Sequence, residues 1–252
     1  YWRYAGAGTT NTAAPSISTG SLSTPGLKPS TGNKVSFNTT QLGSARIQTS
    51  GAINSGTVYW SGLLRVNDVS NLNAVNGMLL GGFNNTPGPG TLPTSVGAVL
   101  RIRKDTSDVM VNNRYFVGTA MNSGTGAGNI QYATGSPLLA GDTVFVVASY
   151  EFVAGATNDI ARMWVNPNPA DFGGALPPLP TITSAPGLAD SFASLSTFNL
   201  RNVNTVGAPS VDFDELRVGT DWASVTVPEP TSLGLFLLGS CLITLRRNIF
   251  ER

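Results

Sequence analysis

Apolar and polar residues alternate with a period of two along much of the chain, which is the pattern of β-strands with one buried face. In the segment 97–104, Arg101 and Arg103 fall on one face and Leu100 and Ile102 on the other. Alternation, together with β-branched, aromatic or continuously apolar runs, predicts further strands at 34–38, 45–49, 57–66, 77–83, 143–152, 160–167, 196–201 and 210–218. No amphipathic helical pattern precedes residue 230. The chain is therefore predicted to be all-β, with a sandwich or jelly-roll architecture.

Two local signals predict how strands pair. The long apolar strand 143–152 and the strand 160–167 are joined by residues 153–159, whose glycine and asparagine suit a hairpin loop. Residues 45–49 follow the strand 34–38 closely and are its expected partner.

The chain divides into three parts by composition. Residues 1–33 are rich in Gly, Ser, Thr and Pro and are read as an irregular N-terminal segment that could belong to the sandwich. Residues 34–226 are predicted to form one β-sandwich domain, and residues 227–252 form a separate tail. Position 1 is Tyr and no leader-like segment follows it, so a leader peptide is expected to be missing.

Composition excludes several classes of function. The formal net charge is +1 and charged residues are 12% of the chain, so nucleic-acid binding has no electrostatic support. The chain has no histidine, which excludes Ser-His-Asp and Cys-His catalysis and imidazole metal sites. Its one cysteine, Cys241, rules out an intrachain disulfide.

The tail has the composition of a membrane-entering segment. Residues 231–245 are uncharged and mostly apolar, and Arg246 and Arg247 follow them. A full membrane span needs roughly 20 such residues, so the bilayer would have to thin locally. The positive-inside rule places the two arginines in the cytoplasm and the domain outside. The alternative is a buried or amphipathic C-terminal helix of the domain.

Pro228, Glu229 and Pro230 are followed by an apolar run and then by a basic pair. This order of three parts resembles the PEP-CTERM sorting signal of bacteria. The resemblance implies export and recognition by an exosortase-type membrane peptidase, followed by release or transfer at the motif. Pro228, Glu229 and Pro230 would be the recognition motif, and Arg246 and Arg247 the stop of the membrane anchor. It also implies a membrane-anchored precursor that reaches the cell surface or the extracellular matrix.

Two strands of the body carry a second resemblance. The segments 211–218 and 163–167 resemble strands of concanavalin A-like, laminin-G-like domains. The resemblance implies an antiparallel jelly-roll sandwich of the concanavalin A-like class, to which the tail adds one short C-terminal transmembrane helix. It brings no catalytic residue with it.

The strongest candidate for catalysis is a run of acids. Glycoside hydrolysis needs only two carboxylates, and Asp212, Asp214 and Glu215 lie close together in one strand. Strand alternation puts Asp212 and Asp214 on one face and Glu215 on the other. The favoured interpretation is structural: these acids pair with Arg217 or with neighbouring strands and anchor the last strand.

Calcium and sugars are the remaining ligands that the residues allow. Calcium could bind near predicted turns, although turn and capping roles are the favoured interpretation for the acids there: Asp105, Asp108, Asp142 and Asp159. Exposed aromatic rings would stack on sugars, and adjacent Tyr59 and Trp60 should point to opposite faces, one into the core and one outward. The full set of candidate rings is Tyr59, Trp60, Tyr115, Tyr132, Tyr150, Trp164 and Trp222.

These observations favour an exported surface or matrix protein with a structural or adhesive role and no enzymatic activity. The alternative is a carbohydrate-binding module for exopolysaccharide, and a glycoside hydrolase ranks below it. A membrane-tethered protein whose tail is never cut is a further alternative. Expected partners are an exosortase-type peptidase, the membrane and extracellular polysaccharide, with no nucleic acid and no assigned ligand-binding residues.

Overall fold

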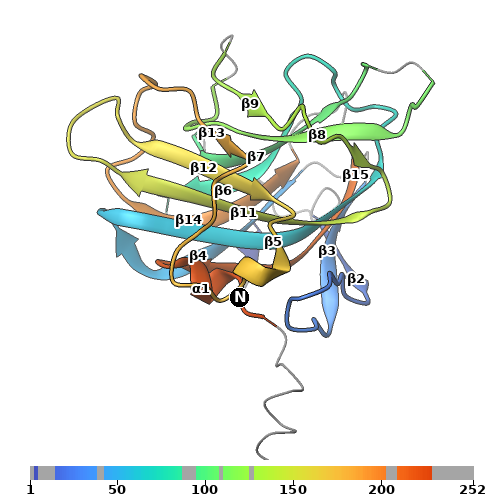
Figure 1. Cartoon of the computed structure of the whole chain (residues 1–252), viewed down its shortest axis with the longest axis horizontal. Coiled ribbons are helices and arrows are strands. Elements are labelled where there is room, and N and C mark those ends of the chain that lie inside the picture. Colours follow the sequence, from blue (N-terminus) through green and yellow to red (C-terminus); the bar gives the residue numbers. More distant parts are fainter. Residues whose placement is uncertain are drawn as a thin grey trace, which may run out of the picture.

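The computed structural model describes residues 3–4, 15–38, 43–86, 95–107, 110–124, 128–202 and 209–228. These residues form an all-β sandwich of two antiparallel sheets (Figure 1). The fold class predicted from alternation is confirmed at this level.

The first sheet has eight strands in the order β1-β4-β14-β6-β7-β8-β10, with β9 attached to β8. These strands are β1 (Arg3–Tyr4), β4 (Gly43–Ile53), β6 (Met78–Asn84), β7 (Gly97–Lys104), β8 (Arg114–Thr119), β9 (Gln131–Tyr132), β10 (Leu138–Leu139) and β14 (Leu195–Asn202).

The second sheet has seven strands in the order β13-β12-β11-β5-β15-β3-β2. These strands are β2 (Ser16–Thr19), β3 (Asn33–Phe37), β5 (Gly56–Asp68), β11 (Thr143–Phe152), β12 (Ile160–Val165), β13 (Ile182–Thr183) and β15 (Ser210–Gly219). The last strand, β15, lies between β5 and β3, so the two ends of the body meet in this sheet.

One predicted pairing is confirmed and one is wrong. The hairpin of β11 and β12 forms with the register Val146↔Val165. The segment 45–49 lies in β4 and pairs with β14 and β1, whereas β3 pairs with β15 and β2 in the other sheet. The chain changes sheet between β3 and β4, so closeness in sequence did not produce a hairpin there.

The main core lies between the two sheets. Alternation along β5 sends Val58, Trp60 and Leu64 into this core, where the Trp60 ring lies 5.2 Å from the ring of Phe198 across the interface. The indole Nε1 of Trp60 donates a hydrogen bond to the carbonyl of Ala98, 3.1 Å away. The only polar atom of this ring is thereby satisfied while its apolar surface joins the sheets.

The outer face of the seven-stranded sheet is also buried. It is covered by residues 21–30, residues 168–179 and the short helix α1 (Trp222–Val225), which we call the cover layer. The buried residues of this second cluster are Leu22, Leu27, Tyr59, Leu63, Phe145, Val147, Trp164, Phe172, Trp222 and Val225.

The cover layer corrects two expectations. Tyr59 points away from the main core, as alternation predicted, but it is only 9% exposed because Trp164 and Trp222 pack against it. The prediction of one exposed ring in the Tyr59–Trp60 pair is therefore wrong. Helix α1 was not expected, because a single turn capped by Asp221 is too short to show a helical period.

No helix among the described residues is long and apolar enough to cross a membrane. The expected membrane run, residues 231–245, lies outside the described residues.

Replacing Trp222 with Ala is expected to lower the free energy of unfolding by about 3–5 kcal/mol, because the ring is fully buried in the cover layer. Urea unfolding of the full chain in mild detergent measures the change. Val75→Ala is the control, since Val75 is 74% exposed and should change stability by less than about 0.5 kcal/mol. A two-step unfolding curve for the wild-type chain would show instead that the cover layer unfolds separately.

Candidate functional site

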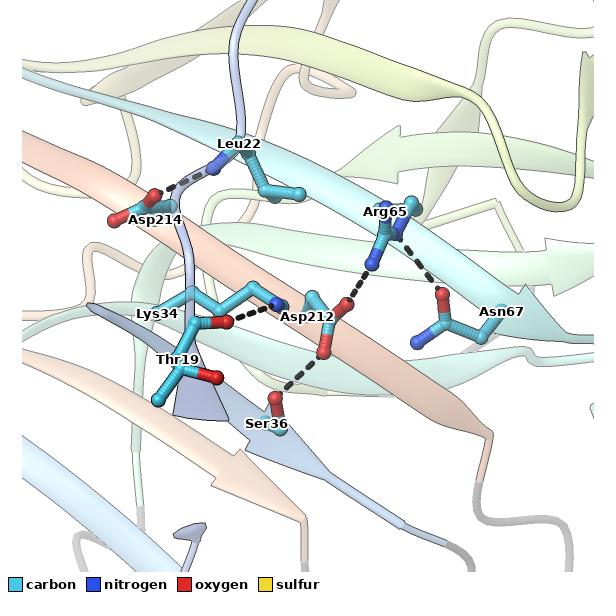
Figure 2. Close-up of polar contacts among 8 residues, drawn as sticks. All are labelled: Thr19, Leu22, Lys34, Ser36, Arg65, Asn67, Asp212 and Asp214. Carbon is cyan, nitrogen blue, oxygen red and sulfur yellow. Dashed lines mark hydrogen bonds and ion pairs between the residues drawn. The ribbon is translucent and has the colours of Figure 1, made fainter. Parts of the chain in front are cut away.

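The acids of β15 are held by neighbouring strands. Asp212 forms an ion pair with Arg65 of β5, with 2.6 Å between Nη2 and Oδ2, and accepts a hydrogen bond from the hydroxyl of Ser36 on β3 (Figure 2). Asp214 accepts a hydrogen bond from the backbone N–H of Leu22 in the cover layer. Both carboxylates therefore join β15 to chain segments far away in sequence.

A β-bulge changes the predicted position of Glu215. The register shifts between Asp214 and Arg217, and Glu215 has a φ of +51°, which is rare for a residue other than glycine. Glu215 consequently lies beside Leu63 and forms an ion pair of 3.1 Å with Arg217. The predicted opposite face for Glu215 is wrong, while the predicted pairing of these acids with Arg217 and neighbouring strands is confirmed.

The side chain of Asp212 is 6% exposed. Burial alone would raise the pKa of this carboxyl group, but hydrogen bonds from Ser36, Arg65 and Asn67 stabilise its charged form and hold the pKa below the ordinary value. Asp212 therefore remains ionised and paired at neutral pH. A paired, ionised acid suits a structural role better than that of a proton donor.

Most of the candidate aromatic rings are buried. Tyr132 is the exception, since it is half-buried at the edge of the eight-stranded sheet. Its hydroxyl donates to the carbonyl of Asn76, and the guanidinium of Arg103 lies 4.3 Å from its ring centroid. Burial raises the pKa of Tyr132 to about 12. Both its hydroxyl and its ring face are already engaged within the protein.

A pocket of about 600 Å³ lies at one end of the sandwich. Three segments line it: the turn between β4 and β5, the loop between β11 and β12, and the segment before β14. Its lining residues are Asn54, Ser55, Phe152, Val153, Ala154, Gly155, Asp159, Asp190, Ser191, Phe192 and Ala193.

Asp190 holds one wall of this pocket. Its carboxylate accepts hydrogen bonds from three successive backbone N–H groups, those of Thr157, Asn158 and Asp159, at 2.9–3.0 Å. Three donors on one carboxylate fix the loop between β11 and β12, in which Gly155 has a φ of +126°. The loop is thus shaped before any ligand arrives.

Asp159 is fixed from the other side. It accepts one hydrogen bond from the hydroxyl of Tyr150, at 2.6 Å, and one from the backbone N–H of Val153, at 2.8 Å. Burial, followed by the bond to Asp159, raises the pKa of Tyr150, so its hydroxyl keeps its proton as a donor. Each oxygen of Asp159 has one donor and can accept a second.

Phe152 is one of the apolar residues that line the pocket, together with Val153, Phe192 and two alanines. Its ring is half-buried, and its centroid lies 4.9 Å from that of Tyr150. The set of candidate rings missed Phe152 because it contained only Tyr and Trp. The available signal was its place at the end of an apolar strand, directly before the loop of the predicted hairpin.

The candidate calcium ligands are dispersed. Asp105 forms an ion pair with Arg114 and accepts hydrogen bonds from Ser107, which is a turn role. Asp142 is exposed before β11, and Asp108 lies outside the described residues. In the part of the chain that the structure describes, no three Asp, Glu, His or Cys side chains gather in a way that could hold a metal ion.

Only the first residue of the sorting motif falls within the described residues. Pro228 forms an antiparallel bridge with Leu27 and approaches Gly173, where an added Cβ atom would lie 3.2 Å from the proline ring. The backbone N–H of Lys28 donates to the carbonyl of Val227. Glu229, Pro230, Arg246 and Arg247 lie outside the described residues.

No family model and no curated protein matches this chain. Among solved structures it is similar to the T. cruzi calreticulin globular domain, with a TM-score of 0.46 and 9% identity over 98% of this chain and 95% of that one. Peanut lectin gives a TM-score of 0.37 and 12% identity, covering 87% of this chain and 98% of its own. The exoplasmic/lumenal domain of VIP36 gives 0.35 and 10%, covering 82% and 87%. The two-sheet architecture described above rests on the strand register itself.

Replacing Asp212 with Asn is expected to destabilise the protein by about 1–3 kcal/mol at pH 7, because Arg65 and Ser36 lose an ionised partner. The pKa of Asp212 is lowered in the folded state, so its contribution is complete above its ordinary unfolded pKa and is lost as pH falls through the folded pKa. Urea unfolding between pH 7 and pH 3 should show the two proteins converging at low pH.

Glu215→Gln is the control for this comparison, because the side chain of Glu215 is 27% exposed, against 6% for Asp212, and its ion pair with Arg217 should contribute less than about 1 kcal/mol. A constant difference between the wild-type protein and the Asp212→Asn variant across this pH range would contradict the structural role given to Asp212.

Proposed function

We propose that this protein is an exported carbohydrate-binding domain, and that the pocket between the β11–β12 loop and the segment before β14 binds the sugar. The pocket itself carries the proposal: its volume of about 600 Å³ lies in the range of small-ligand sites. Phe152 offers an apolar ring face to a pyranose, and Asn54 and Asp159 offer hydrogen-bonding groups to its hydroxyls.

The rigidity of the pocket supports binding. Asp190 and Asp159 are both held by hydrogen bonds within the protein, so a ligand meets groups that are already oriented. Because little side-chain and loop freedom is lost on binding, a few hydrogen bonds and one ring contact suffice for measurable affinity.

The charge of the pocket selects among sugars. Its lining contains two carboxylates, Asp159 and Asp190, and no basic side chain. A uronate or sulfate group would meet like charge there, which at short range costs on the order of 1 kcal/mol or more. The proposed ligand is therefore a neutral glycan.

Binding is proposed in preference to hydrolysis. The acid run in β15, the strongest sequence candidate for a glycosidase, is engaged in the contacts of Asp212 with Arg65 and of Glu215 with Arg217.

We further assign the sandwich to the concanavalin A-like jelly-roll class, an assignment supported by the place of β15 inside its sheet, between β5 and β3.

The tail supplies the proposed route to the cell surface. Residues 228–230 and 231–245, followed by Arg246 and Arg247, have the order of a sorting signal read by an exosortase-type peptidase. Export as a membrane-anchored precursor would place the pocket outside the cell, where extracellular polysaccharide is available as a ligand.

A glycan array tests the sugar site. The full chain in mild detergent is expected to bind neutral glycans, and Phe152→Leu should weaken that binding about tenfold, because the ring face is lost while bulk is kept. Uronate-containing glycans should bind about tenfold more weakly than neutral ones, because of the carboxylates in the pocket.

Phe116→Leu is the matched control, since Phe116 is buried on the eight-stranded sheet and does not line the pocket. Equal weakening by both variants would assign the loss to folding. No binding by a folded wild-type chain would leave a structural or protein-adhesive role as the function.

Mass spectrometry of the mature protein from its native cell tests the sorting signal. The expected C-terminus lies at or near residues 228–230, because the peptidase would act at the motif. A mature chain that still ends at Arg252 would contradict processing and favour a permanently tethered protein.

A further inference from the structure

The cover layer contains two solvent-exposed leucines, in a segment that also contacts Pro228, the last residue that the structure describes. Leu179 is 93% exposed and Leu176 is 80% exposed. The indole Nε1 of Trp164 donates to the carbonyl of Pro178, between the two leucines. The two leucines are therefore exposed on a segment that is hydrogen-bonded to β12.

This segment lies close to Pro228. The backbone N–H of Gly173 donates to the hydroxyl of Thr226, and Gly173 also approaches the ring of Pro228. Gly174 lies in turn near the carbonyl of Leu176. Leu176 and Leu179 therefore lie three and six residues along the chain from Gly173, which contacts Pro228, and Val227 beside Pro228 is 37% exposed.

The length of chain beyond Pro228 decides what can face this surface. The uncharged run begins at Thr231, three residues on, and three residues span at most about 11 Å when fully extended. The polar headgroup layer of one leaflet is about 5–8 Å thick. A body joined to a membrane segment by so short a connection must lie against the headgroups.

We propose that the side of the cover layer formed by Leu176, Leu179 and Val227 lies on the lipid bilayer, with both leucines inserted among the headgroups, while the tail is membrane-embedded. This inference rests on the proposed membrane insertion of residues 231–245. It adds a second membrane contact, made by the folded domain itself, which orients the body on the bilayer.

Charge has a smaller part in this contact. Lys28 is exposed next to Val227 and offers a cation to lipid phosphates. Asp171 lies in the cover layer and Asp221 caps its helix α1, so these two carboxylates offset the charge of Lys28. The contact should therefore depend on the leucines and form on zwitterionic bilayers as well as on anionic ones.

Site-specific fluorescence quenching in phosphatidylcholine vesicles tests the proposal on the full chain. The native Cys241, the single cysteine, carries the probe that reports on the tail. In a Cys241→Ser background, Leu179→Cys carries the probe that reports on the cover layer. Val75→Cys is the control, because Val75 is 74% exposed and its loop is bonded through Asn73 to Lys104 of the other sheet.

A nitroxide lipid labelled near the headgroups is the quencher. The probe at position 179 is expected to be quenched at least about threefold more than the probe at position 75. Adding Leu176→Asp should reduce quenching at 179 to the level at 75 without changing the melting temperature, since Leu176 is 80% exposed.

Quenching at Cys241 with none at 179 would overturn the contact and leave tail insertion standing. Absence of quenching at Cys241 would overturn both, because the tail would then lie outside the bilayer. Quenching at 179 that survives Leu176→Asp and equals that at 75 would show general adsorption and would also overturn the oriented contact.

Discussion

The burial of the outer face of the seven-stranded sheet is the constraint on which the rest of the structure depends. A sandwich needs only one buried face per sheet, but here Tyr59, Trp164 and Phe145 make a second apolar surface that must also be removed from water. Segments from both ends of the body supply the cover: Leu22 and Leu27 from the N-terminal side, and Trp222 from the C-terminal side. The cover layer therefore fixes where both ends of the body lie.

This constraint explains why the acids of β15 have structural roles. Asp214 lies under the cover layer and satisfies the backbone N–H of Leu22, which would otherwise be buried without an acceptor. Asp212, one pleat away on the same face, is ionised and needs Arg65 as its partner. In a sequence, acids close together in one strand suggest catalysis. In this fold, Asp212 and Asp214 instead lie beside hydrogen-bond donors that need an acceptor.

Local sequence patterns predicted the positions of the longer strands, but they predicted neither the short strands, such as β9 and β13, nor the third layer. The segment 143–152 was recognised because its apolar residues and the loop after it formed a consistent local pattern. The same segment also contained the signal for two-sided burial, since Val144–Tyr150 are all buried and show no polar alternation. Alternation alone made Tyr59 look exposed, because a period of two tells which face a residue takes and not what covers that face.

The pocket could not be predicted for a different reason. Asn54, Phe152 and Asp190 come from three segments that meet only when both sheets are assembled, so no spacing in the sequence joins them. The single local cue was the apolar strand ending in Phe152 before a glycine-containing loop. The pairing of β3 with β15 could not be predicted for the same reason, because these strands come from opposite ends of the body and no local pattern joins them.

The positions of the pocket and of the departing tail are compatible with one protein doing both proposed tasks. None of the residues that line the pocket belongs to the cover layer, which holds Val227 and Pro228 through Lys28 and Leu27. A membrane lying against the cover layer would contact Leu176 and Leu179, while the pocket opens from the loops between β4 and β5 and between β11 and β12. Anchoring therefore uses residues that binding does not need, so a variant of either surface can be tested without altering the other.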